Sequence, residues 1–399
     1  MQQSGVSSRR VNIPFVPIAA GMMFFIGFEW GGFQLALLRV AQEFSLTESM
    51  MGVLAGLQFL AMAGLPLLVG RLADRVGKKR ILLMFLPVFV LGCVLAVLSR
   101  SPFVFILAVL LIGTGFSVTE CVSAAVVSDI KGGASARTMN VVQSLFSIGA
   151  VAGPLVSEFF MLRGTSWRVV FLAAGLGYLL LYPLLLLSRV PAVKTEEVRR
   201  GNMLRLFKTP MLAFMGIAMF LYVGIESGIA FFIDSFFHLE FSQAGIGAYG
   251  IAIFWLCTAL SRIAFGQIRF QPRRVVLLGF ALITGLIVLM YFVTGEAGML
   301  ILCAAAGIAC GPVWPIIASL GMGACPEDTG TAMGVLSTTG SLGGAALPAL
   351  IGVLTELWGI RPAFMALAAV ALATTGIMLV VQVYFKRKAQ LPCAPEQSG

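Results

Sequence analysis

Three carboxylates lie within long apolar runs of the chain: Glu29, Glu120 and Glu226. An acid at the centre of a membrane helix costs about 3 kcal/mol on insertion scales, so an acid kept there predicts a functional role. A low dielectric favours the neutral form of a carboxyl group, which makes reversible protonation near neutral pH possible. We therefore expect these acids to couple proton movement to function. The alternative for each is a permanently hydrogen-bonded acid that fixes helix packing.

A second set of polar and aromatic side chains lies in the same runs and could contact a solute. Amides offer both donors and acceptors to hydroxyl groups, and an indole ring stacks on a sugar ring or a flat apolar molecule. Packing in the core or anchoring at the lipid interface is the alternative for the aromatic residues. The candidates for a substrate cavity are Gln34, Gln58, Asn140, Gln143, Tyr222, Trp255 and Trp314.

The composition is typical of a polytopic membrane protein. Of the 399 residues, 59% are hydrophobic and 11% are charged, whereas a soluble domain is roughly 45–50% apolar and about 25% charged. The formal charge of +10 is spread over short loops, which argues against nucleic-acid binding. The seven cysteines form no CxxC pair and there is one histidine, so the sequence predicts no metal site. No nucleophile–base pair typical of an enzyme is evident, and we expect no cofactor beyond a proton gradient.

Membrane crossings follow from runs of about 20 apolar residues. Twelve are predicted, and all but five of the 27 Lys and Arg residues then fall on the side of the tails and even-numbered connections. The positive-inside rule makes that side cytoplasmic and places both termini there. Glu158 and Asp234 fall near the other ends of their helices, where we expect them to be solvated. The predicted crossings are 14–40, 49–70, 79–98, 103–127, 138–161, 168–188, 210–236, 243–266, 274–294, 298–320, 329–354 and 362–385.

The chain consists of two similar halves. Gly27-Phe28-Glu29 and Gly224-Ile225-Glu226 lie 197 residues apart, and the same offset relates Phe44-Ser45 to Phe241-Ser242. Pro154 followed by Arg168 has a counterpart in Pro348 followed by Arg361. Such repeats indicate two pseudo-symmetric six-helix bundles with a substrate path between them. We expect bundles over residues 1–188 and 209–399, with a cytoplasmic linker containing an amphipathic helix over 189–208.

A strongly charged stretch, Gly70-Arg-Leu-Ala-Asp74-Arg75-Val-Gly77-Lys78-Lys79-Arg80, separates two apolar runs. It resembles the loop between the second and third helices of the major facilitator superfamily of transporters. The resemblance implies an all-α fold of twelve transmembrane helices and a gating role for this loop. We expect Lys78 to pair with Asp129 and to hold the cytoplasmic side closed. The gating candidates are Gly70, Asp74, Arg75, Gly77, Lys78, Lys79, Arg80 and Asp129.

A narrower resemblance, to the fucose-permease type of major facilitator, covers nearly the whole chain. It rests on Gly113-Thr-Gly115 running to Thr119-Glu120, on Arg137-Thr-Met-Asn140-Val-Val-Gln143, on Tyr222-Val-Gly224-Ile-Glu226 and on Gly311-Pro312-Val-Trp314-Pro315. It implies that Glu120 is a proton-coupling residue. Gln34 takes the place of the aspartate that works with this glutamate in the family, so the partner of Glu120 stays open. Drug/proton antiporters are the main rival: Gly149-Ala-Val-Ala-Gly153-Pro154 suits them, whereas the absence of an arginine in the fourth helix does not.

We therefore expect a secondary active transporter that moves a small, sugar-like organic solute together with protons across the cytoplasmic membrane by alternating access. Lipid, protons and the solute are the expected partners, and the protein is expected to be a monomer. A proton-driven exporter of drugs or metabolites is the alternative function. A membrane receptor that binds without transport is a more distant one.

Overall fold

The structure is a computed structural model that describes residues 13–129, 134–189, 209–242, 245–267, 271–325 and 329–390. Two short strands, β1 (Ile13–Pro14) and β2 (Ser188–Arg189), pair in parallel. The helices of the N-terminal half are α1 (Phe15–Glu43), α2 (Glu48–Met62), α3 (Leu65–Val76), α4 (Lys78–Leu98), α5 (Pro102–Asp129), α6 (Ala134–Met161) and α7 (Val169–Leu187). Those of the C-terminal half are α9 (Pro210–Phe241), α10 (Ile246–Gln267), α11 (Pro272–Phe292), α12 (Glu296–Cys310), α13 (Val313–Gly323), α14 (Thr329–Trp358) and α15 (Ile360–Gln390).

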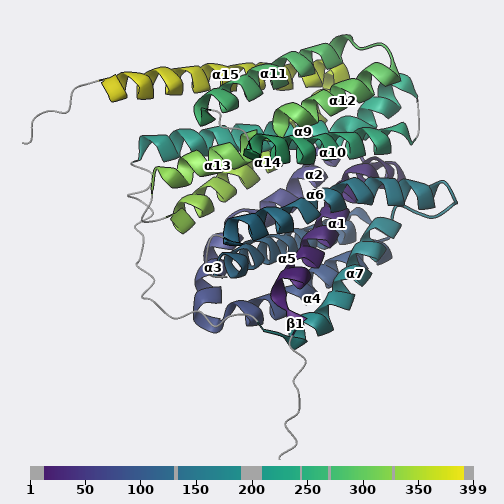
Figure 1. The fold of residues 1–399 in the computed structure, drawn as a ribbon. Coiled ribbons are helices and arrows are strands. Elements are labelled where there is room, and N and C mark those ends of the chain that lie inside the picture. The colour runs from purple at the N-terminus through teal and green to yellow at the C-terminus, as the bar shows by residue number, and fades with distance from the viewer. Residues whose placement is uncertain are drawn as a thin grey trace, which may run out of the picture.

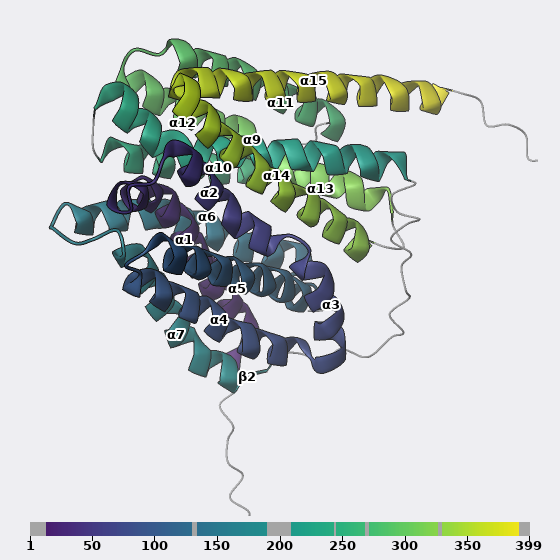
Figure 2. The same ribbon diagram turned by 180° about the vertical axis from the view of Figure 1, so that it is seen from behind.

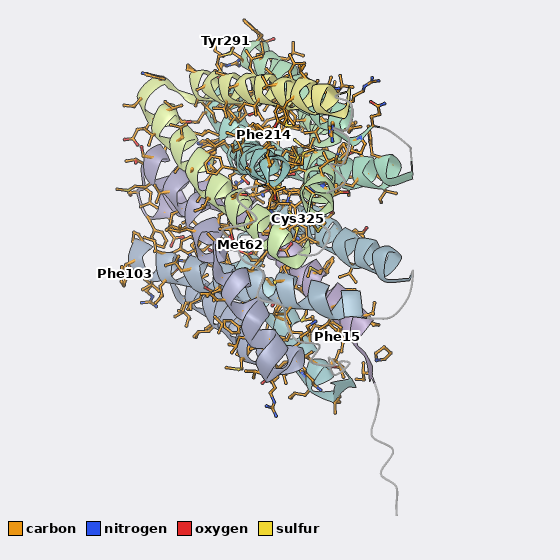
Figure 3. All side chains as sticks on the ribbon, turned by 90° about the vertical axis from the view of Figure 1, so that its left-hand side faces the viewer. Phe15, Met62, Phe103, Phe214, Tyr291 and Cys325 are labelled. Atoms are coloured by element: carbon orange, nitrogen blue, oxygen red, sulfur yellow. The ribbon has the colours of Figure 1, made fainter. Side chains whose placement is uncertain are left out.

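The helices have the length and composition of membrane crossings. Eleven are long and apolar enough to span a bilayer, with α12 and α13 counted as one. The shorter α2 and the following α3 together occupy the range predicted for the second crossing. Large apolar side chains such as Phe103, Leu68 and Leu180 point outward, and Figure 3 shows carbon-rich side chains around both halves. The expected polytopic fold of twelve crossings is confirmed.

Two crossings predicted as continuous are broken. The second is interrupted at Ala63 and Gly64, where Gly64 adopts φ +76°, a conformation open to glycine and strained for other residues. The tenth is interrupted at Gly311 and Pro312. Proline has no backbone N–H and its ring collides with the preceding turn, so a helix bends or stops there. Each break leaves carbonyl groups without helical partners in the middle of a crossing.

The charged stretch at residues 70–80 is more helical than the sequence suggested. We predicted a loop, but α3 ends at Val76 and α4 begins at Lys78, with only Gly77 between them. Gly77 adopts φ +104°, which lets the chain turn within one residue. Lys79 Nζ then donates to the carbonyl oxygens of Leu186 and Ser188, at 2.8 and 2.5 Å. This lysine therefore ties α4 to the end of α7 within its own half.

Close helix packing in both halves depends on glycines at equivalent contacts. In the N-terminal half, α1 lies along α6, and in the C-terminal half α9 lies along α14. A Cβ atom added at Gly149 would overlap the carbonyl oxygen of Phe24 across the first contact, and one at Gly343 would overlap that of Phe220 across the second. Small residues let membrane helices approach at backbone distance, where dispersion and weak polar contacts stabilise the pair.

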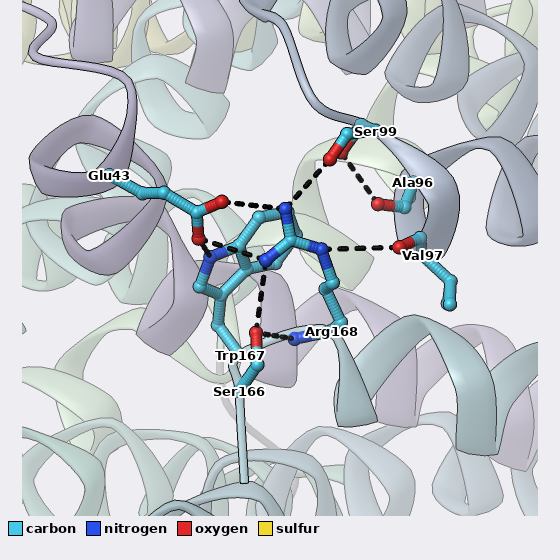
Figure 4. Close-up of polar contacts among 7 residues, drawn as sticks. All are labelled: Glu43, Ala96, Val97, Ser99, Ser166, Trp167 and Arg168. Carbon is cyan, nitrogen blue, oxygen red and sulfur yellow. Dashed lines mark hydrogen bonds and ion pairs between the residues drawn. The ribbon is translucent and has the colours of Figure 1, made fainter.

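The same ion pair also occurs once in each half. Arg168, before α7, donates to Glu43 Oε1 at 2.6 Å and to Glu43 Oε2 at 2.9 Å, and its Nε donates to the Val97 carbonyl oxygen at 3.1 Å (Figure 4). Arg361, in α15, donates to Glu240 at the end of α9 and to the Tyr291 carbonyl oxygen at the end of α11. The repeat predicted from Arg168 and Arg361 is thus visible as one shared set of contacts.

The two halves meet mainly toward one face of the molecule. We call this the Arg39 face; it carries the connections 44–47, 99–101, 162–168 and 293–295 and residue Gly359. There α2 packs on α14 and α6 packs on α10, and a Cβ added at Gly56 would overlap the carbonyl oxygen of Ala345. The Ser49 amide also donates to Glu356 Oε2 at 3.0 Å across the halves. Toward the opposite face α3 and α13 are separated in both views (Figures 1 and 2).

The glycine contact between α1 and α6 generates a stability prediction. We expect Gly149→Ala to lower the free energy of unfolding by roughly 1–3 kcal/mol, because the added methyl collides with backbone rather than with a movable side chain. Gly376→Ala is the matched control, since nothing lies within 4 Å of its added Cβ and alanine is the better helix former. Thermal unfolding in detergent measures both. Equal melting temperatures for the two variants would contradict the packing argument.

Candidate functional site

Glu29 lies inside the N-terminal half, hydrogen-bonded to a single amide. Its Oε2 accepts from Gln58 Nε2 at 3.0 Å, and both side chains are buried. The remaining oxygens, Glu29 Oε1 and Gln58 Oε1, have no hydrogen-bond partner in the described part of the chain. A protonated Glu29 could donate its hydrogen to Gln58 Oε1, whereas an ionised Glu29 has no hydrogen to donate. The geometry therefore allows Glu29 to hold a proton but gives it no cation.

Glu120 lies in the C-terminal third of α5 and is partly exposed. Phe116, one turn earlier on the same helix face, packs on Trp30 and on Phe146 with ring centroids 5.6 and 5.9 Å away. This direction leads toward the interface between the halves, because Trp30 in turn contacts Phe231 of α9 at 5.5 Å. Glu120 is thus a carboxyl group placed on a mainly aromatic wall. Tyr178 lies within electrostatic reach of both Glu29 and Glu120.

Two predicted cavity residues meet across the halves. Trp255 Nε1 of α10 donates to Gln34 Oε1 of α1 at 2.9 Å, and the Trp255 ring lies edge-to-face with Phe146 at 6.2 Å. Both side chains are buried. From the sequence, Gln34 and Trp255 could be placed at a similar depth in the membrane, but their contact could not be predicted. It shows that in this state the interface is closed at Gln34.

A tyrosine, a carboxyl group and an arginine surround the break between α12 and α13. The Tyr222 hydroxyl oxygen lies 2.7 Å from Glu226 Oε1 and 2.8 Å from the carbonyl oxygen of Cys310. Arg262 Nη2 lies 3.5 Å from the same Glu226 oxygen. Arg262 Nε donates to the Gly311 carbonyl oxygen at 3.1 Å.

The chemistry of the break explains why an arginine is present there. In an unbroken helix the Gly311 carbonyl would accept the N–H of residue 315, four positions later. Residue 315 is a proline and has no N–H. Arg262 supplies the missing donor, so the sequence Gly311-Pro312-Val-Trp314-Pro315 creates the acceptor that holds the guanidinium. Trp314, a predicted cavity residue, is partly buried against the core beside this break.

A cluster of charges that sequence reasoning missed joins the halves at the Arg39 face. Arg39 of α1 donates to Asp234 of α9 and to the carbonyl oxygen of Leu35, the latter at 3.0 Å. Its Nη2 also lies 3.5 Å from Glu158 Oε2 of α6. Asp234 is 3% exposed and Glu158 6%. The expectation that these two acids are solvated was wrong, because closure of the halves covers both.

A usable signal for this cluster was present in the sequence. Arg39, Glu158 and Asp234 were all predicted at the same end of their helices, and unlike charges at one depth in a membrane protein tend to pair. What the sequence could not show is that they come from different halves. Gln42 and His238, whose Nε2 atoms lie 3.4 Å apart, form a second polar contact across the same face.

Several predicted gating and cavity residues have side chains outside the part of the chain that the structure describes. The side chains of Asp74, Arg75, Asp129, Asn140 and Gln143 lie outside the described residues, so the expected pair of Lys78 with Asp129 stays a prediction. Gly70 lies within α3, Lys78 is buried and Arg80 is exposed. Among the residues the structure describes, no group of three or more His, Cys, Asp and Glu side chains could hold a metal ion.

Comparison with known proteins identifies the family. The sequence profile of the Major Facilitator Superfamily matches residues 19–268 and 237–396. The chain belongs to the Major Facilitator Superfamily. This is a family of transporters rather than enzymes, and it agrees with the twelve-crossing architecture and the charged stretch at residues 70–80.

Relatives within the superfamily include multidrug resistance proteins. MdtL of Shewanella sp. is 26% identical over 181 residues, which cover 42% of this chain and 46% of MdtL. MdtM of Salmonella typhimurium is 27% identical over 197 residues, covering 49% of this chain and 46% of MdtM. The matched region thus spans about half the length of these relatives. The narrower resemblance to fucose permeases stays a prediction.

Solved structures of superfamily members share the whole fold. A bacterial homologue of the human lysosomal transporter Spinster, in an inward-facing and unoccupied conformation, superposes with a TM-score of 0.77 at 15% identity, covering 95% of this chain and 98% of the other. FucP in the outward conformation gives a TM-score of 0.65 at 18% identity, with 92% and 98% covered. At these identities the likeness concerns the fold alone.

The Arg39 cluster generates a prediction about the contact between the halves. Removing one partner of a buried ion pair costs on the order of 3–5 kcal/mol, and even a third of that shifts an equilibrium about tenfold. We expect Asp234→Asn to lower the yield of the disulfide between Gln42→Cys and His238→Cys, made in a cysteine-free background. Glu240→Gln is the control, since its partner Arg361 lies in the same half. A similar yield in both variants would mean that Arg39 does not hold the halves together.

Proposed function

We propose that this superfamily member is a proton-coupled secondary transporter of a small organic solute. The observation that carries the proposal is Glu120, an ionisable side chain that is partly exposed within α5, one helical turn after Phe116, whose ring packs on Trp30 of α1. A carboxyl group at the interface of two repeats can face each side of the membrane in turn, binding a proton in one state and releasing it in the other. Glu29 and Glu226 are further proton sites in this proposal.

The proposal includes an orientation. In this proposal the protein is a monomer in the inner membrane, with both termini in the cytoplasm. The Arg39 face then lies on the non-cytoplasmic side. Contacts between the halves at that face then close the outer entrance, and the solute path faces the cytoplasm. The charged residues from Gly70 to Arg80, with Asp129, would hold the cytoplasmic side closed in the opposite state.

The nature of the solute separates two candidate functions. A sugar-like solute taken up with protons follows from the fucose-permease resemblance. A proton-driven exporter is supported by the relatives named multidrug resistance proteins and by the apolar aromatic cluster of Trp30, Phe116 and Phe146 next to Glu120. A receptor that does not transport would show saturable binding without flux.

Exchange of the Glu120 proton can be tested directly. A panel of sugars, polyols, organic acids and dyes is first screened for thermal stabilisation of the purified protein, since a ligand of the folded state raises its stability. In liposomes with a pH gradient, we expect Glu120→Gln to abolish uphill movement of the stabilising solute and to retain counterflow exchange, because the amide imitates a permanently protonated acid.

Glu296→Gln is the matched control for this experiment, since Glu296 begins α12 at the Arg39 face, away from the interface wall that contains Glu120. We expect it to behave as the wild type. Uphill movement that persists in Glu120→Gln would remove Glu120 from the mechanism.

The direction of movement distinguishes uptake from export. In liposomes with an alkaline interior, protons flow inward; a symporter then accumulates the solute inside, whereas an antiporter expels solute that was loaded beforehand. Solute counts in both gradient directions measure this with the wild-type protein. We expect the direction of solute flux to reverse when the pH gradient is reversed. Flux that does not depend on the gradient would contradict proton coupling.

A further inference from the structure

The contacts of Tyr222 determine where a proton lies. Its hydroxyl group has one hydrogen, yet the oxygen is within hydrogen-bond distance of two acceptors, Glu226 Oε1 at 2.7 Å and the Cys310 carbonyl oxygen at 2.8 Å. With an ionised Glu226, one of these short contacts would bring two oxygens together with no hydrogen between them. A protonated Glu226 donates to Tyr222, which then donates to Cys310, and both contacts are satisfied.

Protonation of Glu226 changes the state of Arg262. A neutral carboxyl group does not balance the guanidinium charge, and the 3.5 Å separation between Arg262 Nη2 and Glu226 Oε1 is long for a charged pair. The other hydrogen bond of Arg262, to the Gly311 carbonyl oxygen, carries no compensating charge. The side chain is nevertheless 29% exposed. With respect to the described residues, it is therefore a cation with unused N–H donors inside the C-terminal half.

The direction of Arg262 is toward the interface between the halves. Seven residues are nearly two full turns of a helix, so Arg262 lies on the face of α10 that carries Trp255, about 10 Å further from the Arg39 face. Trp255 contacts Gln34 and Phe146 of the N-terminal half. Arg262 thus lies beyond the closed contact at Gln34, further from the Arg39 face.

We propose that Arg262 binds the anionic group of the transported solute, and that Glu226 takes up one proton when the anion binds. This rests on the proposed transport function and names its substrate class: an organic monoanion with an apolar body. The arrangement in the structure, with a protonated Glu226 donating to Tyr222, is the one that accepts the anion at Arg262. In the alternative arrangement an ionised Glu226 pairs with Arg262 and competes with the anion. One proton and one anion enter together, so the site keeps its net charge.

Few other ionisable groups act on Glu226. Tyr222 on α9, Arg262 on α10 and Cys310 on α12 are those in contact or in electrostatic reach. The helix α13 contains no ionisable side chain. In α14 the sole charged residue is Glu356, which bonds the Ser49 amide at the Arg39 face. In α15 the described charged side chain is Arg361, bound to Glu240, and the closest acid of α1, Glu29, is bound to Gln58.

Binding of matched charged and neutral probes tests the proposal without a pH gradient. The full-length protein in lipid nanodiscs is titrated with phenylacetate, p-toluenesulfonate and phenyl phosphate, and with the neutral phenylacetamide, using thermal unfolding as the readout. We expect at least one anion to stabilise the wild type more than phenylacetamide does. Its affinity should fall as the pH rises, by up to about tenfold per pH unit, because an ionised Glu226 competes for Arg262.

Variants separate the roles of the two residues. Arg262→Gln should weaken the anion roughly tenfold to hundredfold while leaving phenylacetamide unchanged. Arg262→Lys should retain part of the affinity, which shows that loss in Arg262→Gln is not misfolding. Glu226→Gln should keep anion binding but remove its pH dependence. With a pH indicator, in the pH range where anion affinity depends on pH, we expect about one proton to be taken up per bound anion in the wild type and none in Glu226→Gln.

The outcomes that overturn the proposal are distinct from failure of transport. Equal stabilisation by anions and phenylacetamide in the wild type would exclude an anion site, as would an Arg262→Gln protein that binds the anion normally. Proton uptake that persists in Glu226→Gln would assign the proton to another acid. The proposed function itself fails only if gradient-driven flux is absent or independent of Glu120, which none of these binding measurements examines.

Discussion

Arg39 sits between carboxylates of both halves, and the state of the molecule depends on how that charge is satisfied. In hydrocarbon a guanidinium group needs a counterion or water, and here it obtains Asp234 from α9 and Glu158 from α6. Two acids and one arginine can be gathered there only if the halves close at this face. The packing of α2 on α14 brings glycines against backbone in the same region, so electrostatic and steric complementarity favour the same closed arrangement.

The two halves share their helix architecture but differ in the polar contacts of equivalent acids. The pairs of Glu43 with Arg168 and of Glu240 with Arg361 fix the ends of equivalent helices in the same way. Glu29 and Glu226 are also equivalent, 197 residues apart, but their surroundings differ. Glu29 has a neutral amide as its partner, whereas Glu226 has a tyrosine and an arginine. The same backbone position therefore holds an acid bonded to a neutral amide in one half and an acid beside a tyrosine and an arginine in the other.

The sequence predicted the number of crossings and the repeat, because hydropathy and the spacing of residues along the chain determine both. It did not predict the breaks at Gly64 and Gly311, since a single glycine or proline is often tolerated in a membrane helix. It also treated Asp234 and Glu158 as separate solvated acids. The depth of a charged residue follows from its position in one helix. Which charged residues pair depends on which helices of the two halves lie together, and a local sequence pattern does not show that.

Positions along α9 connect the two charged centres. Glu226 and Asp234 are eight residues apart, or about 12 Å along the axis. One engages the arginine of α10 at the break in the tenth crossing, and the other engages Arg39 of α1 at the closed face. A helix is stiff on this scale, so a displacement of α9 that follows a change in the Glu226–Arg262 pair also moves Asp234 relative to Arg39. Opening the Arg39 face exposes an arginine and two acids, and the free energy for this must come from binding elsewhere. A charge change at Glu226 acts on the same rigid element and is well placed to provide it.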